Sequence, residues 1–256
     1  MAELTHLSYS SINSYLMCGR AWKYHYIDRI ETLTAPALVF GSAFHAMAEK
    51  YVANGGDLSV LWQESWAAQQ ERDSRIDWGV ESPEGLGDTG QRIAKSASVV
   101  ELLDSLRAQY RGDDPRCALE KRVELRVPGV PVPVIGYIDI ITADGVPGDF
   151  KTAARMWSDS QAADAMQSLF YLAALNQSGV EVPDWAFRHY VFTKTTRPAA
   201  KMFEVKHKPS EIFWLFEMIQ ETWRGIDAGV FVPNPGTWKC SPKYCEYWGM
   251  CRGKGA

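Results

Sequence analysis

The sequence lacks any run of 18 apolar residues, so it predicts no membrane-spanning helix. Its first residues, MAELTHLSYSS, have neither the positive segment nor the apolar stretch of a secretory signal, and we expect a cytoplasmic protein. An excess of positive charge is also missing, because 27 Lys and Arg residues face 31 Asp and Glu residues, for a formal net charge of -4. Non-specific coating of nucleic acid is therefore not expected, although a local basic cleft is compatible with this balance.

Low-complexity tracts and internal repeats are missing too. The 256 residues are 46% hydrophobic and 23% charged, which is typical of a globular protein and excludes a disordered, collagen-like or coiled-coil chain. This length is sufficient for a sizeable buried core, and we expect a single domain over residues 1–256.

Cysteine is scarce, with five residues in the whole chain. In a reducing compartment these five cysteines indicate a metal site or free thiols in preference to disulfides. Cys240, Cys245 and Cys251 cluster near the C-terminus, and Cys18 stands alone near the N-terminus. Four thiolates can hold zinc or an iron–sulfur cluster, and free buried thiols are the plainer alternative. Cys117 precedes a predicted strand and is expected to be an ordinary thiol.

Periodicity predicts a mixture of helices and strands. Helices are predicted over residues 8–17, 42–53, 58–71, about 91–110, 160–177 and 209–228. Strands are predicted over residues 118–127, 132–142, 146–152, 185–193 and 200–206. The glycine-rich segment 79–90 fits GxGxxG, but no strand precedes it, so a loop without nucleotide binding is expected. This order predicts an α/β or α+β fold with a small central sheet covered by helices, followed by an irregular tail over 231–256.

Two acidic residues flank the predicted hairpin turn at 143–145. Asp139 lies on the first strand and Asp149 on the second, so both can converge on one hard cation such as Mg²⁺. Lys151 lies two residues beyond Asp149, which places both side chains on one face of the strand. Such an arrangement suits phosphodiester hydrolysis, whereas a surface strand with a salt bridge is the competing interpretation.

Four ordered elements resemble the PD-(D/E)XK nuclease superfamily in its RecB-type branch. They are Gly41-Ser-Ala-Phe-His45, Gly136-Tyr-Ile-Asp139, Asp149-Phe-Lys151-Thr and Gln167-Ser-Leu-Phe-Tyr171. The resemblance covers roughly residues 40–171 and implies a restriction-endonuclease-like fold with a central mixed sheet flanked by helices. It implies a mostly helical part over 1–110, a nuclease core over 111–208, and a last helix with a cysteine-rich tail over 209–256.

The resemblance also assigns roles to individual residues. His45, Asp139 and Asp149 are implied to bind Mg²⁺ or Mn²⁺ with the main-chain carbonyl of Phe150, and Lys151 is the implied catalytic lysine. Gln167 and Tyr171 are implied to face the active site, and their i,i+4 spacing places them on one helix face. Without the family, His45 would more often be a hydrogen-bonded helix residue, and Gln167 and Tyr171 an ordinary helix rim. Glu120, on the preceding strand, is a further candidate near the metal.

The cysteine pattern resembles that of RecB-type nucleases with a 4Fe–4S cluster, which include CRISPR-associated and phage exonuclease branches. Ser8-Tyr-Ser10-Ser-Ile-Asn-Ser-Tyr15-Leu-Met-Cys18 follows their N-terminal helix motif closely. The four residues between Cys240 and Cys245, which include Pro242, depart from the usual two, so zinc is retained as the alternative. The resemblance implies that Cys18, Cys240, Cys245 and Cys251 hold one cluster and join the two chain ends.

The combined interpretation is a metal-dependent DNA exonuclease that acts on DNA ends in recombination, repair, or CRISPR or phage DNA processing. DNA is the expected partner, with a recombinase or strand-annealing protein as a further one. The alternatives are a structure-specific endonuclease and a non-catalytic DNA-binding or scaffold protein on the same fold.

Overall fold

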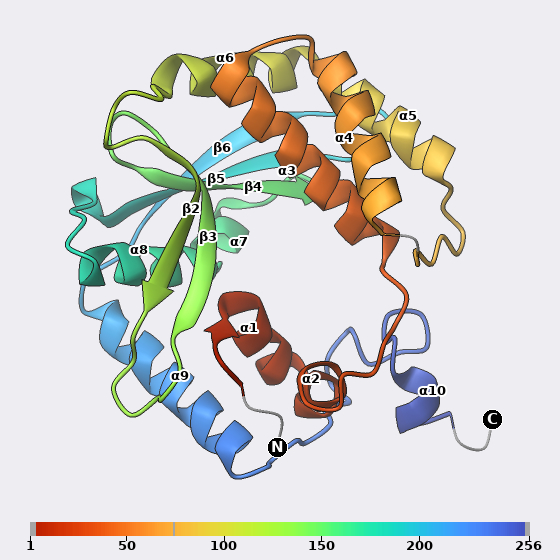
Figure 1. Ribbon diagram of the computed structural model, residues 1–256, viewed down its shortest axis with the longest axis vertical. Helices are drawn as coiled ribbons and strands as arrows, with labels where there is room; N and C mark the ends of the chain where they lie inside the picture. Colours follow the sequence, from red (N-terminus) through yellow and green to blue (C-terminus); the bar gives the residue numbers. More distant parts are fainter. Residues whose placement is uncertain (1–3, 74, 254–256) are drawn as a thin grey trace. The chain divides into compact units, whose positions relative to one another are not determined.

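The structure is a computed structural model that describes residues 4–73 and 75–253. The chain divides into two compact units, coloured along the sequence in Figure 1. The first unit consists of residues 1–33, 124–136 and 210–256, and the second unit consists of residues 34–123 and 137–209. Among the described residues, no helix is both long and apolar enough to cross a bilayer.

The second unit is built on a mixed sheet. The strands follow the order β3 (Val134–Ile141), β4 (Pro147–Ala153), β5 (Ala186–Thr193) and β6 (Ala200–Lys206), and β2 (Ala118–Leu125) pairs with β3. The end of β2 and the start of β3 belong to the first unit. Strands β3 and β4 are antiparallel across a turn in which Gly145 has a φ of 80°, which confirms the predicted hairpin. Strands β4 and β5 are parallel, and β5 and β6 are antiparallel.

Helices cover both faces of this sheet (Figure 1). They are α3 (Pro36–Asn54), α4 (Leu58–Arg72), α5 (Pro83–Ala94) and α6 (Ala97–Gln109) on one face, and α7 (Asp159–Ala163) and α8 (Gln167–Gln177) on the other. Tyr190 and Phe192 of β5 pack in the core with α3 to α6, whereas Val191 between them packs with Ala162 of α7. This alternation is what a strand buried on both faces requires, and the predicted mixed sheet flanked by helices is confirmed.

Helix α3 begins six residues earlier than predicted. Pro36 occupies its first turn, where a missing amide hydrogen costs nothing, and Gly55 with a φ of 72° ends it. Phe40, Phe44 and Met47 are fully buried at helical spacing, so α3 forms the centre of this core.

The loop predicted over 79–90 is wrong, because most of it is helix α5. Ser82 caps the helix by accepting a hydrogen bond from the amide of Gly85, and Pro83 follows at the first helical position. The glycines serve packing in place of flexibility. A Cβ on Gly90 would lie 1.9 Å from Trp62 Cε2, so only glycine lets α5 approach the buried indole of α4 this closely.

We expect Gly90→Ala to destabilise the protein by on the order of 3 kcal/mol, because Trp62 must leave its buried position to admit the methyl group. The measurement is a urea unfolding midpoint. Gly249→Ala is the control, since nothing lies within 4 Å of the Cβ that it adds. Equal midpoints for the two variants would contradict this packing.

Two predicted helices are each broken in two. The break between α5 and α6 falls at Ser96, whose hydroxyl donates to the carbonyl of Pro198 at 2.8 Å and so fixes an extended backbone there. The break between α7 and α8 lies before Gln167, where the Ser168 hydroxyl donates to the carbonyl of Ala165 at 2.7 Å. The hydrogen bond of Ser168 is local and competes with the helix, whereas that of Ser96 reaches a residue far along the chain. A short 3-10 helix, η1 (Pro183–Trp185), was not predicted.

The first unit consists mainly of helices. Its elements are β1 (Leu7–Ser8), α1 (Tyr9–Met17), α2 (Gly19–Tyr26), α9 (Glu211–Asp227) and α10 (Trp248–Cys251). Ser8 caps α1 in a reciprocal capping box with Ser11, and β1 pairs in parallel with the first residues of β3. Helix α2 was not predicted. The tail is irregular as predicted except for α10, and its last residues, 254–256, lie outside the described part of the chain.

Candidate active site

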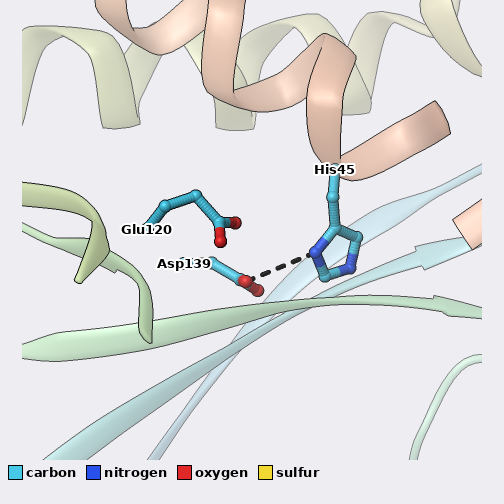
Figure 2. A group of neighbouring side chains, drawn as sticks. All are labelled: His45, Glu120 and Asp139. Atoms are coloured by element: carbon cyan, nitrogen blue, oxygen red, sulfur yellow. Dashed lines mark ion pairs between the residues drawn. The ribbon is translucent and has the colours of Figure 1, made fainter. Parts of the chain in front are cut away.

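Three potential metal-ligating side chains meet in the second unit (Figure 2). His45 comes from α3, Glu120 from β2 and Asp139 from β3, and one donor atom of each lies within 4.8 Å of the others. The Nδ1 atom of His45 is 3.3 Å from Oδ1 of Asp139. These groups line an open cavity of about 680 Å³ between α3, the end of α4 and strands β2 to β4.

Asp139 is held in place by the neighbouring strand. Its side chain is nearly buried, and its Oδ2 atom accepts a hydrogen bond of 2.5 Å from the amide of Phe150 on β4. The ring of Phe150 in turn packs edge-on against His45, with the ring centroids 5.9 Å apart. The predicted hairpin thus fixes both the carboxylate and the imidazole.

The charged side chains around this cavity shift one another's pKa values. Burial disfavours the charged imidazolium of His45, but the carboxylates of Asp139 and Asp149 outweigh it and raise the pKa of His45. Burial raises the pKa of Glu120, and the charges of Asp139 and Glu49 raise it further. The cavity therefore concentrates negative charge that a bound cation would relieve.

The backbone of Glu120 has an unusual conformation for a strand residue. Its φ of 45° lies in the left-handed region, which is uncommon for residues other than glycine and is typical of a bulge. Backbone strain of this kind is often found at functional sites. Glu124, another acid of the same strand, instead pairs with Arg126 at 2.7 Å.

A network of contacting polar side chains runs from β4 to α8. The Nζ atom of Lys151 lies 2.7 Å from Oδ2 of Asp149 and donates to Oε1 of Gln167 at 2.7 Å. Gln167 donates to the hydroxyl of Tyr171 at 3.0 Å, and that hydroxyl donates to the carbonyl of Tyr137 at 2.5 Å. The four predicted residues of this network, Asp149, Lys151, Gln167 and Tyr171, are thus joined by direct contacts. Lys151 contacts two of them.

Asp149 is buried, and burial together with the nearby charge of Asp139 raises its pKa, while Lys151 opposes this shift. Its carboxylate is close enough to influence His45 and Asp139, but it does not belong to the compact group of three. The donors of that group, two carboxylates and one imidazole, suit a divalent cation such as Mg²⁺ or Mn²⁺. Phe150 also lines the cavity.

Sequence reasoning missed several residues of the cavity. Glu49 lies one helical turn after His45, and its pKa is raised by burial and by Asp139, so the i,i+4 spacing from His45 was a usable signal. Gln69 and Arg72 on α4 also line the cavity. Nothing local in the sequence connects α4 with the hairpin, because only the packing of α4 on α3 brings it there.

The four cysteines of the predicted cluster all lie in the first unit. Burial raises the pKa of the Cys245 thiol, and the nearby thiols of Cys18 and Cys240 contribute to the shift. Within the described residues, no three cysteine sulfurs lie within 4.8 Å of one another. Cys117 lies in the second unit, with its sulfur beside the amide of Arg111 at 3.4 Å.

The start of the tail is anchored next to Cys18 without any metal. Gly19 approaches the backbone of Val232 so closely that a Cβ would lie 3.1 Å from its nitrogen. The ring of Trp22 stacks on that of Phe231 with centroids 5.8 Å apart, and the hydroxyl of Tyr15 donates to the carbonyl of Val230 at 2.6 Å. Aromatic packing and hydrogen bonds thus fix the segment that leads to Cys240.

Comparisons with known proteins identify the family of this chain. A family model described as the PD-(D/E)XK nuclease superfamily matches residues 6–252. The chain is 28% identical over 271 residues to the gene 69 protein of Mycobacterium phage D29, covering 95% of each protein. It is 22% identical over 286 residues to the gene 69 protein of Mycobacterium phage L5, covering 93% of each.

A solved structure shares the fold. The crystal structure of a "putative exonuclease" from Eubacterium rectale superposes with a TM-score of 0.65, covering 98% of this chain and 89% of that one. The sequence identity of 13% limits this likeness to the arrangement of helices and strands.

Proposed function

The chain belongs to the PD-(D/E)XK nuclease superfamily, and from this premise we propose that it is a metal-dependent exonuclease that hydrolyses phosphodiester bonds at DNA ends. One observation carries the proposal. The compact group of His45, Glu120 and Asp139 lies in the same cavity as Lys151, whose ammonium is fixed by Asp149 and Gln167. A surface salt bridge would need neither buried carboxylates nor the hydrogen bond from Lys151 to Gln167.

We propose that His45, Asp139 and Asp149 hold Mg²⁺ or Mn²⁺ together with the carbonyl of Phe150, and that Glu120 completes the site. When bound, the ion lowers the pKa of a coordinated water and neutralises charge on the phosphate. Asp139 is oriented for this role by the amide of Phe150, and His45 is oriented by Asp139 and by the Phe150 ring.

Lys151 carries the second part of the proposed mechanism. Its ammonium is a compact positive charge with three donors, two of which are used by Asp149 and Gln167. The remaining donor can orient the attacking water or stabilise negative charge that develops on the phosphate. Tyr171 and Gln167 act as positioning residues, since their hydrogen bonds fix the end of the lysine side chain.

Similar proteins from two mycobacteriophages support a role in the processing of phage DNA in the cytoplasm of an infected cell. We propose a recombinase or strand-annealing protein as the partner that receives the exposed strand. The E. rectale structure with the shared fold is titled a "putative exonuclease", and we propose exonuclease activity for this chain in preference to structure-specific endonuclease activity.

The test uses linear and circular DNA of equal length, both single- and double-stranded, with Mg²⁺, Mn²⁺, Ca²⁺ or EDTA. An exonuclease releases nucleotides from linear DNA in Mg²⁺ or Mn²⁺ and leaves covalently closed circles intact. Cutting of circles at the same rate would indicate an endonuclease instead. Binding without cutting under every metal condition would favour a non-catalytic DNA-binding protein.

We also propose that Cys18, Cys240, Cys245 and Cys251 hold a 4Fe–4S cluster in the first unit. Zinc bonds to sulfur of about 2.3 Å would place tetrahedral ligands about 3.8 Å apart, closer than any three of these sulfurs lie. The segment 230–232 contacts Tyr15 and Gly19, so the start of the tail lies next to Cys18, which supports a shared site.

We expect Cys18→Ser to lose most of the iron and to lower the melting temperature, because one thiolate ligand is removed while the aromatic contacts of the tail remain. The measurement is iron and sulfide content with the visible absorbance of anaerobically purified protein. Cys117→Ser is the matched control and should keep its iron. A wild type that contains stoichiometric zinc and no iron would identify the alternative metal.

A further inference from the structure

Among the residues that the structure describes, one cation lining the cavity of the candidate active site has no partner that neutralises its charge. The acidic walls of this cavity are formed by Glu49, Glu120 and Asp139, and the one lysine among its described lining residues, Lys151, is paired with Asp149. Arg72, in the last turn of α4, is exposed and lines the same cavity. Its guanidinium forms no ion pair or hydrogen bond with any residue that the structure describes.

The backbone that carries Arg72 is fixed, so its side chain begins from a defined point. Trp62 and Trp66 of α4 are buried in the core of the second unit and stack with centroids 5.5 Å apart. After the helix, the carboxylate of Asp73 accepts hydrogen bonds from the Thr34 side chain and from the amide of Arg75. Asp73 is therefore engaged elsewhere and does not neutralise its neighbour.

Gln69 precedes Arg72 by three residues and lines the same cavity. An i,i+3 pair lies on one helix face, so an amide and a guanidinium point to a common region beside the metal-ligating group. Arginine presents a planar fork of donors that matches phosphate oxygens, and it keeps its charge at any working pH. A polyanionic substrate needs such a compensating charge in a cavity with this many acids.

We propose that Arg72, assisted by Gln69, binds a backbone phosphate next to the scissile one and positions the DNA strand over the metal site. This inference rests on the proposed nuclease function. The competing explanation is that Arg72 only complements the negative end of the α4 dipole, as basic residues in last turns commonly do. That role would affect helix stability and leave DNA binding unchanged.

The test compares wild type, Arg72→Gln and Arg72→Lys. Arg92→Gln is the control, because Arg92 is an exposed arginine in the last turn of α5 that does not line the cavity. Binding to a short single-stranded DNA is measured in Ca²⁺ over a range of salt concentrations, and single-turnover cutting is measured in Mg²⁺ at saturating DNA. Arg72→Gln should weaken binding about tenfold. It should also reduce the slope of the logarithm of affinity against the logarithm of salt concentration (the salt slope) by about 0.7, the value for one lost phosphate contact. Arg72→Lys should recover part of the affinity, since it restores charge without the fork.

Cutting at saturating DNA should fall by a smaller factor than affinity in Arg72→Gln, because a misplaced strand still reaches the metal site, and Arg92→Gln should bind and cut as wild type does. If Arg72→Gln binds DNA with the affinity and salt slope of wild type, while the wild-type protein cuts DNA, this inference is wrong and the proposed function stands. A large loss of rate at saturation without weaker binding would also overturn it, by placing Arg72 in the chemical step. A wild type that neither binds nor cuts DNA would instead refute the proposed function along with it.

Discussion

Asp139→Asn should reduce DNA cutting by about 10³-fold or more while the protein stays folded. The substitution removes a charged oxygen from the group formed with His45 and Glu120, and a bound metal supplies several kcal/mol of transition-state stabilisation, where each 1.36 kcal/mol is tenfold in rate. The measurement is the single-turnover rate on linear DNA in Mg²⁺. Mn²⁺ should restore a small part of the loss.

The same substitution should not destabilise the metal-free protein. Asp139 lies close to Glu49, Glu120 and Asp149, and its charge raises the pKa of all three, so losing it relieves repulsion. In EDTA the melting temperature should equal or exceed that of wild type. The rise in melting temperature that Mg²⁺ or Mn²⁺ produces in wild type should largely disappear, because it reports binding to the folded state alone.

Asp113→Asn is the matched control, since Asp113 is an exposed acid of the same unit outside the cavity. It should cut DNA and respond to metal as wild type does. If Asp139→Asn cuts at the wild-type rate, or still gains the full stabilisation by metal, the three-residue group is not the metal site and the proposed mechanism is wrong.

Much of the fold followed from local signals in the sequence. Strand β3 is rich in β-branched apolar residues and the turn after it contains a glycine, and the helix around His45 ends at Gly55, so these elements could be predicted from nearby residues alone. Segment 79–90 could not, because its glycines are explained only by the indole of Trp62, which comes from another helix. A local pattern does not contain the information that a distant tryptophan supplies.

The candidate site shows the same limit. Asp149 and Lys151 lie two residues apart on one strand, so their ion pair could be expected from the pleat of that strand. Arg72 has no such signal, because α4 reaches the cavity only through its packing in the core. The motif residues thus mark the centre of the site, whereas the residues that would contact the rest of a substrate depend on tertiary structure.

Lys151→Met should lower the rate of cutting by about 10³-fold and change DNA affinity far less. The ammonium is held by Asp149 and Gln167 beside the metal-ligating group, where a positive charge is worth most as negative charge develops in the transition state. The measurements are the single-turnover rate in Mg²⁺ and the dissociation constant in Ca²⁺. A loss confined to binding would make Lys151 a phosphate anchor and exclude it from the chemical step.

Removal of the ammonium also leaves the buried Asp149 without its cation, which destabilises a protein unless the carboxylate takes up a proton. Lys151→Arg separates the two effects, because it keeps a positive charge beside Asp149 but replaces the compact ammonium with a planar fork. It should stay folded and still lose about 10²-fold in rate. Lys206→Met is the matched control, since it removes a lysine that pairs at the same distance of 2.7 Å with the exposed Asp184. Full activity in Lys151→Arg would show that any positive charge suffices there, so the donor geometry of the lysine would have no role in the reaction.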